Sequence, residues 1–170
     1  MKHALGLILG AALSLATGTP VHAQEEQPAM STGHHQVISA SPILWMAKWF
    51  NADYERRVRS TMTWGVSGSY LPLGDSDYGR ASVLLRFYPQ RAALLGFYVG
   101  GQSGVYRISD ATEHEVLYGA GMDIGYAWQL GPKRNVAVSL GFGLSRVFGG
   151  GLDASVMIPN ARLANVGVAF

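Results

Sequence analysis

The sequence lacks cysteine altogether, has few charged residues and, beyond its N-terminus, has no long apolar run. Without cysteine the protein has neither a disulfide framework nor a thiol nucleophile, so its stability must come from packing or from a membrane. The 13 basic and 11 acidic residues nearly balance, which gives no electrostatic reason to expect a nucleic-acid partner. Because no stretch of about 18 apolar residues follows the N-terminal segment, a helical membrane protein is excluded.

The N-terminal segment is typical of a secretory signal peptide. Lys2 supplies a positive charge, residues 4–16 form an apolar stretch, and small residues precede a cleavage site between Ala23 and Gln24. The apolar stretch is shorter than the roughly 20 residues that a spanning helix needs, although an uncleaved anchor helix is the alternative. We therefore predict a signal peptide over residues 1–23 and a flexible periplasmic leader over residues 24–34.

The sequence is rich in apolar residues (48%) and in glycine (22 residues). These residues alternate with a period of two, most clearly over 118–128, where large side chains such as Met122 and Ile124 are separated by glycine, aspartate or alanine. A period of two places successive side chains on opposite faces of a strand. High apolarity without long apolar runs is what transmembrane strands produce.

Eight strands are predicted from this alternation and from the prolines that separate the windows. The predicted strands cover residues 35–44, 49–58, 60–71, 79–88, 94–106, 115–128, 135–147 and 160–170. Pro42 falls inside the first of them. If both ends of the barrel chain are periplasmic, the strand number must be even, which requires a tight outer turn near Trp45–Lys48. Short connections near 57–60, 89–92 and 131–134 are expected to alternate with longer outer loops near 71–78, 108–115 and 148–159.

The two faces of the predicted strands differ in size. One face carries Val, Leu, Ile, Phe and Met with almost no Lys or Glu, whereas the other carries mainly Gly, Ala and Ser. A soluble barrel turns its large residues inward and polar residues to water, and the small face here is too small to be a solvated exterior. We therefore predict an all-β fold, an eight-stranded antiparallel up-and-down transmembrane β-barrel over residues 35–170. A soluble periplasmic lipocalin-like binder is the alternative.

Aromatic side chains are expected at both edges of the lipid-facing band, because amphipathic rings favour membrane interfaces. The aromatic residues expected near the periplasmic strand ends are Phe87, Phe97, Tyr126, Trp128 and Phe170. Those expected near the outer strand ends are Trp45, Trp49, Tyr70 and Tyr106. The alternative is that they form the core of a soluble sandwich.

Strand parity also turns a set of polar residues into the barrel interior. They are Asn51, Asp53, Glu55, Arg86, Tyr98, Gln102, Asp123 and Asn165. We expect Arg86 to bridge Glu55 and Asp123, since its planar fork serves two acceptors and buried charges are tolerated only when paired. With Asp53, these residues are predicted to form a polar network that plugs and orders a filled interior, a proton or ion relay being the alternative. Eight strands leave no open channel, so a general porin is not expected.

Candidates for catalysis are few. The adjacent His34 and His35 are a weak metal signal, and we expect neither a metal nor a cofactor. His114 lies in a predicted outer loop, and the residues around it that resemble a His-Ser-acid set are Ser109, Asp110, Glu113 and Glu115. Polar loops have such a composition by default, so we predict a non-enzymatic structural or surface-interaction protein. A lipid-modifying enzyme, for instance a hydrolase acting on lipid A, is the alternative.

Several short motifs resemble those of known barrels. They are Ser41-Pro42-Ile43-Leu44, Tyr54-Glu55-Arg56, Arg86-Phe87-Tyr88-Pro89, Gly96-Phe97-Tyr98-Val99-Gly100, Gly125-Tyr126-Ala127-Trp128 and Pro159-Asn160. On these residues the chain resembles the small OmpA/OmpX-like outer-membrane barrels, and more closely a bacterial domain-of-unknown-function family of that architecture, over roughly residues 35–170. The resemblance implies a fold and an outer-membrane location in a Gram-negative bacterium, but no reaction.

The last strand ends in a pattern similar to the signal read by the outer-membrane assembly machinery. Val166, Val168 and Phe170 alternate to a C-terminal aromatic, whereas Asn165 stands where a glycine is usual. The resemblance therefore implies the assembly machinery and outer-membrane lipid as partners, and we expect a monomer.

Overall fold

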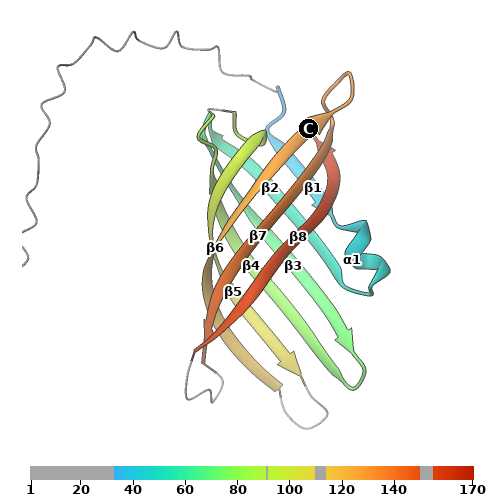
Figure 1. Ribbon diagram of the computed structural model, residues 1–170, viewed down its shortest axis with the longest axis vertical. Helices are drawn as coiled ribbons and strands as arrows, with labels where there is room; N and C mark the ends of the chain where they lie inside the picture. The colour runs from blue at the N-terminus through green and yellow to red at the C-terminus, as the bar shows by residue number, and fades with distance from the viewer. Residues whose placement is uncertain (1–32, 91, 110–113, 150–154) are drawn as a thin grey trace, which may run out of the picture.

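The computed structural model describes residues 33–90, 92–109, 114–149 and 155–170, and in this part of the chain eight strands close into a barrel (Figure 1). The strands are β1 (Gln36–Ala40), β2 (Phe50–Arg59), β3 (Met62–Leu73), β4 (Ser76–Phe87), β5 (Gly96–Ser109), β6 (His114–Leu130), β7 (Val136–Phe148) and β8 (Val156–Ala169). Each strand pairs antiparallel with the next in chain order, and β1 pairs with β8. The predicted eight-stranded antiparallel up-and-down barrel is thereby confirmed.

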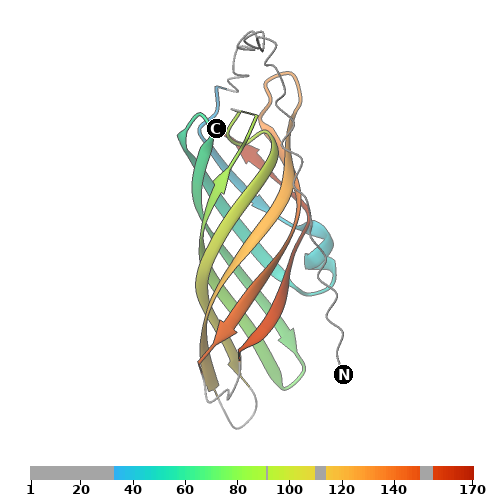
Figure 2. The same cartoon turned by 60° about the vertical axis from the view of Figure 1, so that its left-hand side comes forward.

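The strands are tilted steeply around the barrel axis, as closure of a sheet requires (Figure 2). We call the end that carries the C-terminus and the connection 88–95 the terminal end, and the end that carries the β3–β4 turn the hairpin end. The predicted signal peptide, its cleavage site between Ala23 and Gln24, and the leader up to residue 32 lie outside the described residues.

The first strand is shorter than predicted, because residues 42–44 belong to a helix. β1 ends at Ala40, and α1 (Pro42–Met46) follows it. The hydroxyl of Ser41 caps α1 by accepting a hydrogen bond from the backbone N–H of Leu44, and Pro42 occupies the first turn, where its missing N–H is not needed. This helix replaces the tight turn expected at 45–48. No helix in the described ranges is long and apolar enough to cross a membrane.

The predicted alternation of short and long connections is wrong at two places, whereas the connections expected near 57–60 and 131–134 are short. β3 and β4 extend through the expected loop at 71–78, and only Gly74 and Asp75 join them, because Gly74 adopts the positive φ that a two-residue hairpin turn needs. Conversely, the turn expected at 89–92 belongs to an eight-residue connection, 88–95. Ala92, Ala93 and Leu94 in this connection are buried and help to close the terminal end.

The exterior of the barrel is apolar and its interior is lined by smaller or polar residues, in agreement with the strand pattern. Along β6 and β7 the exposed side chains include Met122, Ile124, Leu140, Phe142 and Leu144. The intervening glycines leave the room that large interior groups need. A Cβ at Gly100, for example, would lie 2.9 Å from the Cγ of Arg86. The same parity therefore produces both the apolar exterior and the space for interior charges.

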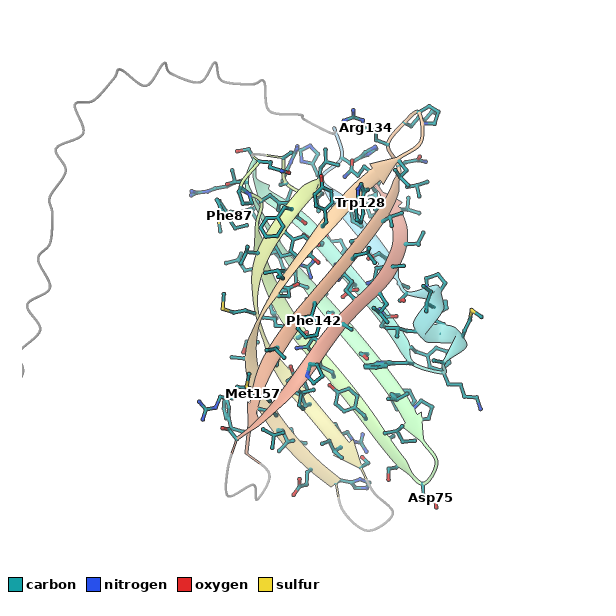
Figure 3. All side chains as sticks on the ribbon, in the orientation of Figure 1. Asp75, Phe87, Trp128, Arg134, Phe142 and Met157 are labelled. Atoms are coloured by element: carbon teal, nitrogen blue, oxygen red, sulfur yellow. The ribbon has the colours of Figure 1, made fainter. Side chains whose placement is uncertain are left out.

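The aromatic residues follow the predicted pattern at one end more closely than at the other. Phe87 and Trp128 are exposed near the terminal end, and Arg134 lies beyond them (Figure 3). At the hairpin end two expectations are wrong. Tyr106 is buried inside the barrel against Leu117 and Val147, and Trp49 is half-buried and lines an interior cavity.

Candidate functional site

An arginine with two acidic partners lies in the barrel interior. Arg86 on β4 donates to Glu55 on β2 through Nη1, and its Nη2 lies 2.8 Å from Oδ2 of Asp123 on β6. Arg86 Nε donates to the same Asp123 oxygen at 3.1 Å. The guanidinium also lies over the Tyr98 ring, 4.5 Å from its centroid. Because only 2% of the Arg86 side chain is exposed, its charge depends on these partners for stabilisation.

Glu55 receives hydrogen bonds from neutral groups as well. The hydroxyl of Thr63 donates to Oε1 of Glu55 at 2.5 Å, and the hydroxyl of Tyr88 donates to the same oxygen at 2.7 Å. A buried ion pair is tolerated when further hydrogen bonds satisfy its remaining lone pairs. The carboxylate of Glu55 is therefore fixed from three sides.

Asp53 is paired with Arg162, a residue that strand parity did not place inside. Arg162 Nη2 lies 3.2 Å from Oδ1 of Asp53, and Arg162 Nη1 lies 3.9 Å from Oε2 of Glu55. Asn165 donates to the other oxygen of Asp53. We call Asp53, Glu55, Arg86, Asp123 and Arg162 the interior ion cluster.

A β-bulge explains why alternation missed Arg162. Ser139 pairs with Asn165 and Gly141 with Arg162, so that two residues on β8 oppose one on β7. Ala164, at this bulge, has a positive φ of 46°. Because a bulge inserts one residue, Asn165 and Arg162 both point inward, although strict alternation puts them on opposite faces. The sequence contains one hint of the bulge, because Ala164 is small whereas the outward residues that follow it, Val166, Val168 and Phe170, are large. In the structure Ala164 is half-buried.

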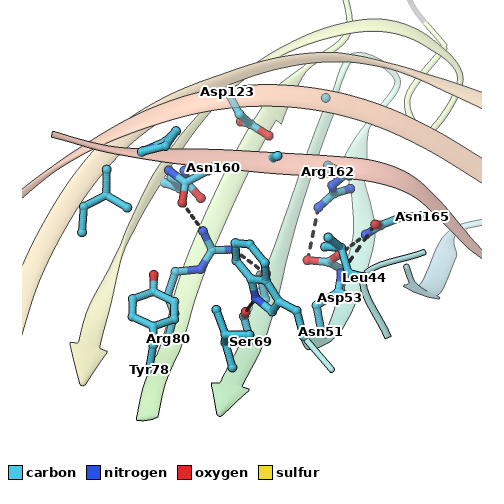
Figure 4. A pocket seen from close by; sticks show the side chains of 18 of the residues that line it. Leu44, Asn51, Asp53, Ser69, Tyr78, Arg80, Asp123, Asn160, Arg162 and Asn165 are labelled. Carbon is cyan, nitrogen blue, oxygen red and sulfur yellow. Dashed lines mark hydrogen bonds and ion pairs between the residues drawn. The ribbon is translucent and has the colours of Figure 1, made fainter. Parts of the chain in front are cut away.

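A cavity of about 420 Å³ extends from the interior ion cluster toward the hairpin end (Figure 4). Its polar lining residues include Asn51, Asp53, Ser67, Ser69, Asp77, Tyr78, Arg80, Gln102, Asn160, Arg162 and Asn165. Its apolar lining residues include Leu44, Leu71, Leu73, Leu84, Ile108 and Ile158. The filled interior that we expected is therefore found only toward the terminal end.

Three arginines line this cavity, and among the described residues Arg80 on β4 is the one that has no acidic partner. Its Nη1 donates to Asn160 on β8, and its Nη2 donates to the hydroxyl of Ser67 at 3.2 Å (Figure 4). Its Nε is buried and makes no hydrogen bond within the part of the chain that is described. Parity with Arg86 on the same strand places Arg80 inside, so this residue was within reach of the sequence pattern.

The barrel wall has a gap beside the cavity. The β1–β8 ladder runs only from Val37–Ala169 to Ala40–Val166, after which the Ser41 hydroxyl donates to the Leu163 carbonyl. From Val156 to Arg162, within the described chain, β8 pairs with β7 alone. We call the edge of β8 over residues 156–162 the lateral seam. Its outward residues Pro159 and Ala161 line the cavity, so the cavity reaches the barrel exterior here.

The histidines are dispersed. His114 begins β6 and pairs across the strands with Ser109, whose hydroxyl accepts a hydrogen bond from Arg107 Nε at 3.0 Å, while Asp110 and Glu113 lie outside the described residues. His34 contacts the Lys133 carbonyl and His35 contacts Arg57. The described residues contain no group of His, Cys, Asp or Glu that suits a metal ion.

The end of the last strand lies at the barrel wall. Val166, Val168 and Phe170 all point outward, and the Phe170 N–H donates to the Gln36 carbonyl at 2.9 Å. The three residues of the expected assembly signal therefore share the exterior face, next to β1.

Residues 13–148 match the family described as a protein of unknown function, DUF3575. The chain belongs to the DUF3575 family. The DUF3575 match ends at Phe148, the last residue of β7, so β8 with Arg162 and Asn165 is not part of it. No curated protein and no solved structure matches the chain. The description of the DUF3575 family assigns no role to its members.

Proposed function

We propose that the protein is a non-enzymatic barrel of the outer membrane of a Gram-negative bacterium, with a structural or surface-interaction role. The observation that carries this proposal is the apolar exterior of a closed barrel. Exposed residues of this face include Val66, Val83, Leu85, Val105, Met122, Ile124, Leu140, Phe142 and Leu144. In water such a surface promotes aggregation, whereas in lipid it is stable and closure pairs nearly all backbone groups.

The orientation follows from the two barrel ends. The exposed rings of Phe87, Phe97, Tyr126, Trp128 and Phe170 near the terminal end suit a membrane interface. With a cleaved signal peptide and an assembly signal at Val166, Val168 and Phe170, the terminal end is periplasmic and the hairpin end faces outward. Outer-membrane lipid and the assembly machinery are then the partners, and the barrel resembles the small OmpA/OmpX-like group in architecture.

The interior supports a structural role. Glu55, Arg86 and Asp123 are paired with one another, and Asp53 is paired with Arg162. A network in which each charge has a partner orders a barrel but exposes no group poised for chemistry. For this reason we expect lipid A from cells with and without the protein to have the same mass spectrum.

Fractionation tests the location directly. We expect the protein in the outer-membrane fraction, with an electrophoretic mobility that changes on heating because a folded barrel resists detergent. A soluble periplasmic protein serves as the fractionation control. Recovery in the soluble periplasmic fraction contradicts the proposal and favours a lipocalin-like binder.

A charge on the exterior tests which solvent this face meets. Ile124 is exposed on β6 and pairs with Phe142, which lies at mid-height of the barrel (Figure 3). In a bilayer Ile124→Arg should lower the free energy of unfolding by roughly 2–4 kcal/mol, because the arginine faces hydrocarbon. Asn135→Arg, in the exposed β6–β7 connection, is the matched control. Equal, small effects of both substitutions in urea unfolding from vesicles contradict a lipid-facing exterior.

A further inference from the structure

We propose that the cavity binds a single-chain amphiphile with an anionic head group, which enters sideways through the lateral seam. The proposal rests on the barrel lying in a membrane, and it assigns a ligand class to the half of the interior that side chains leave open. Three observations support it: the edge of β8, the residues that line the cavity, and the neutral hydrogen-bond partners of Arg80.

The lateral seam exposes a strand edge next to the cavity. Between Val156 and Arg162, β8 has no strand partner in the described chain other than β7. Pro159 is compatible with such an edge, since proline is tolerated where a strand has one free side. Unpaired backbone is tolerated at membrane depth only where protein covers it or where it lines a cavity, and here it lines one.

Exposed apolar residues flank the seam, and helix α1, whose Leu44 lines the cavity, contacts both β8 and β2 beside it. Val156, Met157 and Leu163 are exposed on β8, and Phe50 and Leu73 are exposed on the facing ends of β2 and β3. A hydrocarbon chain that crosses the seam from the lipid can therefore contact these apolar side chains. An ion or a sugar gains nothing from such a rim, which favours an amphiphile over a fully polar ligand.

The cavity is large enough for an amphiphile, and its wall has an apolar part and a polar part. Its volume of about 420 Å³ lies within the range of roughly 300–1,000 Å³ that small-molecule sites occupy. Leu71, Leu73, Ile108 and Ile158 provide apolar wall. Farther from the hairpin end, Arg80, Asn160 and Ser67 provide polar groups that are joined by hydrogen bonds.

Arg80 is the group that selects a negative head group. The other two arginines of the cavity, Arg86 and Arg162, are already paired with carboxylates, whereas Arg80 contacts the neutral Asn160 and Ser67 and keeps a buried Nε without a partner in the described chain. Guanidinium groups match carboxylate and phosphate geometry. A fatty acid and a lysophospholipid offer this same chemistry.

The carboxylates that line the cavity do not cancel this preference. Asp53 and Asp123 are paired with Arg162 and Arg86. Asp77 lies near the hairpin turn, and no ion pair joins it to Arg80 among the described residues. Beside Asn160, the cavity therefore presents the positive charge of Arg80, which has no acidic partner among the described residues.

Trp49, which lines the cavity, reports binding. Replacing Trp45, Trp64 and Trp128 by Phe leaves Trp49 as the sole tryptophan of the full chain. This variant, folded in phosphatidylcholine vesicles and checked by heat-dependent mobility, is titrated with three chain-brominated probes: a fatty acid, a lysophosphatidylglycerol and an alkyltrimethylammonium. Saturable quenching by the carboxylate or the phosphate probe, and not by the cationic probe, is expected. The two anionic arms identify which source the site accepts.

A variant that keeps only Trp64 is the control for quenching from the bilayer. Trp64 is exposed on the exterior face, so its quenching should rise without saturation and equally for all three probes. Saturation at Trp64, or a response of Trp49 indistinguishable from that of Trp64, overturns the proposal.

Substitutions separate the head-group site from the entry route. Arg80→Gln should lower the affinity for the anionic probe roughly tenfold or more, because the charge-assisted hydrogen bonds to the head group are lost. Arg80→Lys should retain part of this affinity, because a lysine ammonium still donates such bonds. Arg107→Gln, on the exterior of the neighbouring strand, should leave affinity unchanged. Ala161→Phe at the seam should slow association several-fold, whereas Ala120→Phe on the exterior of β6 should not.

The outcomes distinguish this proposal from the proposed function. If the chain inserts in vesicles but Trp49 shows no saturable, anion-selective quenching, the binding proposal fails and the membrane barrel stands. If the chain does not insert, the membrane barrel fails, and the folded protein is titrated in buffer with the same probes below their micelle concentrations. Saturable quenching there supports the site, and its absence overturns it.

Discussion

The two halves of the barrel interior are built on different principles. Toward the terminal end the interior ion cluster fills the space, and Glu55, Arg86 and Asp123 are paired across the lumen. Toward the hairpin end a cavity of about 420 Å³ remains, and Arg80 contacts neutral groups there. In the described chain, paired charges therefore accompany the filled half of the interior, whereas the open half holds an arginine without an acidic partner.

The largest effect is expected at the centre of the filled half. Arg86→Ala leaves Glu55 and Asp123 buried without their main counter-charge, so the free energy of unfolding should fall by about 3–5 kcal/mol. Urea unfolding of the folded barrel in detergent measures this loss. Arg107→Ala, on the exterior, is the matched arginine control. Equal stability of the Arg86 variant and the wild type contradicts a structural role for the interior ion cluster.

A smaller effect is expected at the hydrogen bonds that fix Glu55. Tyr88→Phe removes one donor to Oε1 of Glu55 but leaves the ring and the bond from Thr63 in place. Hydrogen bonds to charged groups contribute roughly 1.5–3 kcal/mol, and the loss should lie near the lower end of that range. Tyr98→Phe is a control, since the Tyr98 hydroxyl makes a long bond of 3.4 Å to a carbonyl. Destabilisation by the control equal to that of Tyr88→Phe refutes a specific role for the Glu55 contact.

The smallest effect is expected in the open half. Arg80→Ala removes hydrogen bonds to Asn160 and Ser67, but it strands no carboxylate and it relieves the cost of burying a charge that has no acidic partner in the described chain. These effects oppose each other, so the free energy of unfolding should fall by about 1 kcal/mol or less. The same urea titration provides the measurement. A loss as large as that of Arg86→Ala abolishes the difference between the halves.

The sequence was sufficient for the parts of the fold that follow a simple period. Alternation along 118–128 and 135–147 places Met122 and Leu144 outside and Asp123 inside, and the structure agrees, because a regular strand has no other choice. The same parity placed Arg86, Glu55 and Asp123 in one interior, where the structure brings them together.

The features that were missed depend on local departures from that period. Pro42 was assigned to a strand, but Ser41 caps a helix there. Arg162 was overlooked because the bulge at Ala164 changes the phase of β8. The cavity was not predicted, because strand alternation assigns each side chain to a face but does not say how much interior space the side chains leave empty.

The ladder that closes the barrel joins only four residue pairs of β1 and β8, whereas the β5–β6 ladder joins fourteen. Local opening occurs most readily where the fewest backbone bonds must break together. The β1–β8 junction is therefore expected to open before the other junctions of the barrel, so its amides should exchange with solvent deuterium before those of β5 and β6. The junction that closes the barrel is thus also the one that should open most readily.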